Sequence, residues 1–198
     1  MSSSVTMYGS SHPRNLFDFT LDPPTARPDV AADFGVQADM TYIVRGGMKI
    51  PECLHLLESF TRVNRQADLT CFIIGSNDMS RFRRRRDPAA ACCEELLQLC
   101  SRALELTTGA VVIFGLLPRI DEKYNKWACE VNDLLERRIQ LYQGQRLHFR
   151  PQRPPLRLGP TKIKPSRHLI SSKDDVHLSN RGNSLLYSAV RGAIATHT

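Results

Sequence analysis

The chain has 198 residues, of which 41% are apolar and 24% charged, which is typical of a soluble globular protein with a buried core. It has no run of about 18 apolar residues, and its first residues lack the basic and apolar regions of a secretory signal. We therefore expect one domain over residues 1–198 and no membrane span. The net charge of +7 favours acidic partners.

Short apolar segments along the chain are predicted to be β-strands. Continuous runs of Val, Ile and Phe, as in 69–74 and 110–114, are typical of parallel strands that are covered on both faces. The other candidates are shorter or weaker. In chain order, the predicted strands are residues 5–8, 40–45, 69–74, 110–114 and 146–150.

Amphipathic segments between and after these strands are predicted to be helices. Asp87 and Pro88 form an N-cap followed by a proline at the first helical position. A second helix is predicted around 127–135 with Gly144 as its stop signal, and a third from about 180 to 195. Strands that alternate with helices at this spacing predict an α/β fold with a doubly wound parallel sheet.

Two compositional features complete this picture. Residues 144–173 contain no acidic residue, eight Arg or Lys and five prolines, so we predict a long Pro/Arg-rich connection at about 151–171 and no second domain there. The six cysteines form no Cys-x-x-Cys pair, and most lie in apolar, periodic segments. This pattern indicates buried, reduced thiols in a cytoplasmic protein and argues against a zinc site.

Polar residues and glycines follow the predicted strands, at the edge where such sheets bind ligands. They supply a hydroxyl nucleophile, backbone N–H groups at glycine turns, a side-chain amide and an acid–histidine pair. Acyl transfer requires these groups, because a serine needs a base, the base needs an acid, and the oxyanion needs donors. The segments are GSSH at 9–12, RGGM at 45–48, GSND at 75–78 and, before the last helix, DDVHL at 174–178.

The four segments, in this order and at these separations, resemble the conserved blocks of the SGNH hydrolases, the GDSL-like esterases and lipases. The resemblance implies a flavodoxin-like, three-layer α/β/α fold with a parallel sheet of about five strands. It also implies ester hydrolysis without a metal or organic cofactor, acting on a small-molecule, lipid or sugar ester.

The resemblance assigns Ser11 as the nucleophile, His177 as the base and Asp174 as the acid. Asp174 precedes His177 by three residues, so a turn can bring its carboxylate to one ring nitrogen. Asp175 is the alternative acid, and both carboxylates also suit the positive end of the last helix. Ser11 equally suits a helix N-cap. His12 adjoins Ser11, but neighbouring side chains diverge, so we expect it to line the site or lie at the surface.

The resemblance places the oxyanion between the N–H groups of Ser11 and Gly47 and the side-chain amide of Asn77. Gly46 is the alternative to Gly47, and a glycine here also suits the backbone geometry of a turn. Asn77 alone would be read as a turn residue. One residue departs from the family pattern, because the first block usually has Asp where this chain has Ser10.

A basic run, RFRRRRD, follows the third block at residues 81–87. Such runs are most often solvated surface. On the active-site side of the sheet, however, Arg83, Arg84, Arg85 and Arg86 would attract an anionic substrate, or make weak contact with nucleic acid or an anionic surface.

The sequence therefore predicts a serine esterase or acylhydrolase that cleaves a carboxylic ester through an acyl-enzyme on Ser11. The alternative interpretation is a catalytically inactive scaffold of the same fold that binds nucleic acid or an acidic partner. The blocks also resemble those of the esterase-like domains that some animal retroelements encode.

Overall fold

A computed structural model of the chain describes residues 3–13, 38–63, 67–141, 146–152, 156–157 and 164–198. In these ranges, five strands form one parallel sheet in the order β2-β1-β3-β4-β5. This is a flavodoxin-like order, in which the direction of strand addition reverses between β1 and β3. The strands are β1 (Ser3–Gly9), β2 (Ala38–Val44), β3 (Leu69–Ile73), β4 (Ala110–Phe114) and β5 (Leu147–Arg150).

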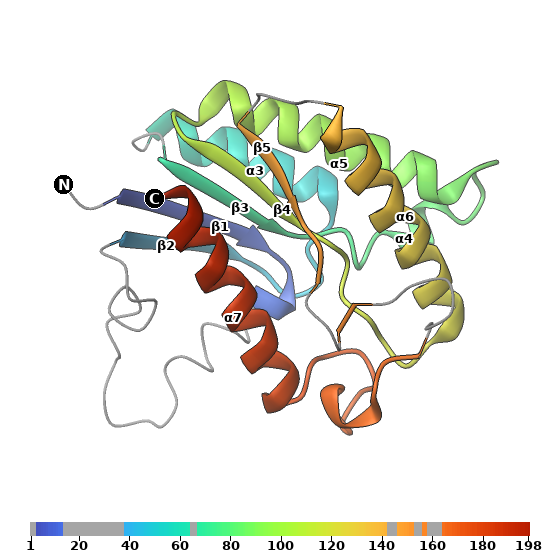
Figure 1. Cartoon of the computed structure of the whole chain (residues 1–198). Helices are drawn as coiled ribbons and strands as arrows, with labels where there is room; N and C mark the ends of the chain where they lie inside the picture. Colours follow the sequence, from blue (N-terminus) through green and yellow to red (C-terminus); the bar gives the residue numbers. More distant parts are fainter. Residues whose placement is uncertain (1–2, 14–37, 64–66, 142–145, 153–155, 158–163) are drawn as a thin grey trace.

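Helices cover both faces of the sheet, which gives the predicted three α/β/α layers. Figure 1 shows α7, drawn in red, on one side and α3, α5 and α6 on the other. None of the helices in the described ranges has the length and apolar character that crossing a membrane requires. The helices are α3 (Ile50–Val63), α4 (Met79–Phe82), α5 (Pro88–Leu106), α6 (Glu122–Gln140), the 3-10 turn η1 (Arg167–Leu169) and α7 (Asn180–His197).

The central strands show why their sequences are continuously apolar. In β3, Leu69, Cys71 and Ile73 pack on the α7 side, whereas Phe72 packs against the opposite helix layer. Successive side chains of a strand point to opposite faces, and both faces are covered here, so apolar residues are favoured throughout. The polar exception in β3, Thr70, is buried and hydrogen-bonds the Thr107 hydroxyl at 2.9 Å.

The predicted strands are all present, with ends within two residues of those expected. The predicted start of α5 is confirmed, because the Asp87 carboxylate accepts a hydrogen bond from Ala90 N at 2.9 Å and Pro88 is the first helical residue. The stop signal at Gly144 lies outside the described residues, as do 153–155 and 158–163 of the expected connection. All six cysteines are buried and unpaired.

Helix α3 was not predicted from the sequence. Its buried side chains Ile50, Cys53 and Leu57 follow helical spacing and pack into the same core as α5. This periodicity is the signal that could have revealed the helix. The omission matters for function, because α3 begins directly after the RGGM block.

Candidate active site

The loops after β1, β2 and β3 lie together at the carboxyl edge of the sheet. They are neighbours because β2 and β3 flank β1. Arg45 N donates to Gly9 O at 3.1 Å, and Ser10 N donates to Ile73 O at 3.4 Å. Three of the four predicted segments are thus joined where ligands bind in sheets of this type.

The fourth segment precedes α7 and holds an acid–histidine pair. Asp174 Oδ2 lies 2.5 Å from His177 Nδ1, and Asp174 Oδ1 accepts the backbone N–H groups of His177 (2.9 Å) and Val176 (3.1 Å). These bonds hold the pKa of Asp174 far below its usual range. Because Nδ1 is taken by the carboxylate, Nε2 is the ring atom of His177 left to accept a proton.

Asp175 has a different environment. Its side chain pairs with Arg167 at 2.5 Å, where both groups are exposed, and its carbonyl accepts from Ile120 N at 3.0 Å. Its backbone is left-handed, with φ of 57°. The N-cap of α7 is Ser179, whose hydroxyl accepts from Gly182 N at 3.2 Å. Neither Asp174 nor Asp175 occupies that cap.

His12 connects the pair to the GSSH segment. It is buried, and its ring centroid lies 5.5 Å from that of His177. Since His12 directly follows Ser11 in a helical turn, His177 lies in the neighbourhood of the predicted nucleophile. Burial, with the nearby charges of His177 and Arg119, lowers the pKa of His12 to about 3. His12 is therefore neutral at pH 7, and its Nδ1 has no hydrogen-bond partner among the described residues.

The amide of Asn77 is oriented by groups on two sides. Its Oδ1 accepts from Arg119 Nη2 at 3.1 Å, and its Nδ2 donates to Met48 O at 3.3 Å. Arg119 also donates to Ser76 O at 2.9 Å, and its guanidinium stacks 4.4 Å from the centre of the Tyr124 ring. The N–H end of the amide thus faces the loop after β2. That loop turns at Gly47, where φ of +76° is the left-handed geometry that favours glycine.

Asp78, the last residue of GSND, links the loop after β3 to the start of α3. It is fully buried, and its two carboxylate oxygens accept from Ile50 N at 3.3 and 3.2 Å. Arg81 donates to it at 2.6 Å and also pairs with Glu95 at 2.8 Å. Burial raises the pKa of Asp78, although both hydrogen-bond donors act in the opposite direction.

Asp78 and Arg119 were not identified as functional residues from the sequence. A carboxylate directly after a buried strand must find partners if it is itself buried, and this was the signal available for Asp78. The sequence offers no comparable signal for Arg119, because its partners come from a distant loop.

No protein-family model matches the sequence, and no curated protein matches it. Solved structures do match. A member of the lipolytic G-D-S-L family from Veillonella parvula DSM 2008 shares 16% identity at a TM-score of 0.69, covering 97% of this chain and 98% of that one. The M. smegmatis aryl esterase shares 12% identity at a TM-score of 0.70, and the match covers 100% of both chains. A carbohydrate acetylesterase from Sinorhizobium meliloti shares 15% identity at a TM-score of 0.67, covering 98% of this chain and 99% of that one.

The chain has the fold of the GDSL-like lipases and esterases. The resemblance inferred from the four sequence blocks is confirmed at the level of the fold. At identities of 12–16% the likeness concerns the fold alone.

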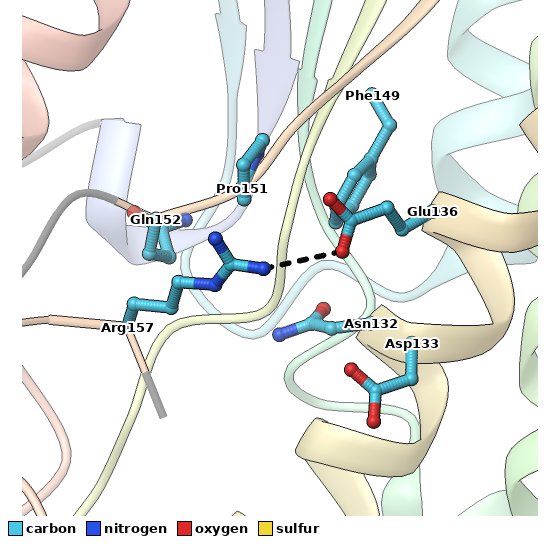
Figure 2. Close-up of a pocket in the computed structure, with 7 residues that line it drawn as sticks. All are labelled: Asn132, Asp133, Glu136, Phe149, Pro151, Gln152 and Arg157. Carbon is cyan, nitrogen blue, oxygen red and sulfur yellow. Dashed lines mark hydrogen bonds and ion pairs between the residues drawn. The ribbon is translucent and has the colours of Figure 1, made fainter. Parts of the chain in front are cut away.

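Two hollows in this GDSL-like fold differ in size. The smaller one, of about 20 Å³, lies between α6 and the segment after β5, where Glu136 and Arg157 pair at 3.3 Å (Figure 2). It has room for little more than a water molecule. The larger one is an open pocket of about 370 Å³ beside Asn77, within the range of small-molecule sites. All four arginines at 83–86 are exposed, but of these only Arg83 lines the pocket.

Proposed function

We propose that the protein is a serine esterase or acylhydrolase that cleaves a carboxylic ester through an acyl-enzyme on Ser11. The observation that carries the proposal is the Asp174–His177 pair, whose imidazole packs against His12, the residue next to Ser11. The fold supports it, because structural neighbours bear the names lipase, aryl esterase and carbohydrate acetylesterase.

In the proposed reaction, Ser11 Oγ attacks the ester carbonyl carbon while His177 Nε2 accepts the hydroxyl proton. Asp174 holds the ring by Nδ1 and stabilises the imidazolium that forms. The tetrahedral intermediate expels the alcohol, which takes the proton from His177. Water then attacks the acyl-enzyme and gives a proton to His177. The second tetrahedral intermediate releases the acid product as Ser11 Oγ takes that proton back.

The oxyanion of each intermediate would be bound by the N–H groups of Ser11 and Gly47 and by the Asn77 amide. Arg119 favours this role of Asn77, since a cation on the amide oxygen directs the N–H end away from itself and polarises it. A neutral His12 adds no second positive charge beside the imidazolium on His177.

Labelling with a fluorophosphonate probe, followed by peptide mass spectrometry, tests the assignment. The adduct is expected on Ser11, and it should be absent from Ser11→Ala and retained in Ser10→Ala. An adduct on Ser10 would mean that the nucleophile is misassigned. If there is neither labelling nor turnover of a panel of short- and long-chain nitrophenyl esters, the chain is an inactive scaffold.

A further inference from the structure

The open pocket adjoins the proposed site at Asn77, which belongs to both. It is formed by the loop after β3, by α4 and by the segment that leads into α6. Met79 supplies apolar surface, to which the stems of long basic side chains add. The lining residues are Ser76, Asn77, Met79, Ser80, Arg83, Arg119 and Lys123.

The charge of this pocket is of one sign. Arg83, Arg119 and Lys123 contribute cations, and of the described residues that line it none is acidic. The neighbouring Arg81 is different, since its charge is used within the fold on Asp78 and Glu95. Arg83 and Lys123, by contrast, form no ion pair within the part of the chain that the structure describes.

We propose that this pocket binds an anionic group of the ester substrate, a carboxylate or a phosphate, through Arg83, Lys123 and the edge of Arg119. The inference rests on the proposed esterase function and narrows its substrate class to esters that carry a negative charge. Planar guanidinium and mobile ammonium groups both suit such anions. Arg119 contacts the pocket and the Asn77 amide, so anion and oxyanion are held by adjoining groups.

The basic run offers a matched control. The double variant Arg83→Gln/Lys123→Gln removes two charges from the pocket lining. Arg84→Gln/Arg86→Gln also removes two charges from likewise exposed residues, but these lie outside the lining. If the basic run acts through its overall electrostatic field, either double variant should weaken the preference for an anionic ester. If the pocket binds the anion, only Arg83→Gln/Lys123→Gln should do so.

The test uses two pairs of esters, so that the anion can lie on either side of the scissile bond. In the first pair, 4-nitrophenyl hemisuccinate is compared with 4-nitrophenyl butyrate. In the second, 4-acetoxybenzoate is compared with its methyl ester. We expect kcat/KM to favour the anionic member of at least one pair at low salt, with the preference shrinking as ionic strength rises. Arg83→Gln/Lys123→Gln should reduce that preference about fivefold, and Arg84→Gln/Arg86→Gln should leave it unchanged.

Binding of inorganic phosphate and of succinate, followed by the melting temperature, separates the two anions without requiring turnover. Whichever anion raises the melting temperature of the wild type should do so less in Arg83→Gln/Lys123→Gln. If neutral esters are hydrolysed but no anionic ester is preferred, the pocket proposal is wrong and the esterase proposal stands. If the wild type shows neither turnover nor labelling, the esterase proposal is wrong. If no anion raises its melting temperature, the proposal of an anion-binding pocket is wrong.

Discussion

The oxyanion side and the acid–base side of the proposed site are held by different kinds of contact. On the oxyanion side, Asp78 and Arg119 bind groups 28 to 43 residues away in the chain, in addition to local bonds such as that from Arg81 to Asp78, and Asp78 is fully buried. On the acid–base side, Asp174 binds groups two and three residues ahead. The side chains of Asp174 and His177 are 42% and 28% exposed.

This difference separates two roles that active-site residues often combine. Long-range bonds from a buried carboxylate position the oxyanion loops and also stabilise the fold, because removing one partner leaves the other buried and unsatisfied. A solvent-exposed bond within one turn orients a ring but adds little to stability. Changes on the first side should therefore lower stability and activity together, and changes on the second should lower activity alone.

The largest effect is expected for His177→Ala. Removal of a general base typically lowers turnover by about 10² to 10⁴, and we expect kcat/KM to fall in that range with little change in melting temperature. His12→Gln is the control. The side chains of Ser11 and His12 diverge because the residues are neighbours in sequence, so the loss of kcat/KM in this variant should be less than about tenfold. Equal losses in the two variants would show that the base has been misplaced.

Asp174→Asn should lower kcat/KM by up to about 10⁴, since a neutral amide does not stabilise the imidazolium and can hold the ring in the wrong tautomer. The matched control is Asp175→Asn. Asn tolerates the left-handed backbone at this position, and the exposed pair with Arg167 contributes little. Steady-state kinetics should show the control within about threefold of wild type. A greater loss in Asp175→Asn than in Asp174→Asn would reverse the assignment of the acid.

Asp78→Asn tests the buried side. The Asn amide can still accept from Ile50 N but loses the charge-assisted bond from the half-buried Arg81, which costs about 1–3 kcal/mol. For a chain of this size that lowers the melting temperature by roughly 2–12 °C. We also expect about a tenfold loss of kcat/KM, because a single amide oxygen replaces the two carboxylate oxygens that accept from Ile50 N. The loop after β2 is then held less firmly in position. In Asp87→Asn the side chain remains a good N-cap, so stability should be nearly unchanged. A stable but inactive Asp78→Asn would mean that the carboxylate takes part in the chemistry.

Much of the fold could be predicted from local sequence. The strands of the sheet are visible because both faces are covered, which makes runs such as 69–74 continuously apolar. The strand order is not visible, because a parallel crossover can place the next strand on either side. Helix α3 could have been predicted as well, since Ile50, Cys53 and Leu57 follow helical spacing.

The candidate site divides in the same way. Its four segments could be brought together because parallel strands end at one edge and because Asp174 and His177 are close in sequence. The partners of Asp78 and Arg119 could not be predicted, since they come from loops that only the folded sheet brings near. For the same reason the sequence cannot distinguish Arg83, which lines the pocket, from Arg84.

The smallest expected effect is on the pH dependence of stability. It arises from the buried His12, which lies beside the exposed Asp174–His177 pair. The pKa of His12 is lowered to about 3, against about 6.5 in an unfolded chain. Between these values the unfolded state binds more protons, so stability falls as the pH falls. From pH 7 to pH 5 this one group should cost about 2 kcal/mol. His197, with a pKa lowered to about 4 by burial, acts in the same direction. Melting curves of His12→Gln should therefore show a shallower loss of stability between pH 7 and 5 than wild type. An unchanged slope would mean that His12 takes up its proton in the folded protein.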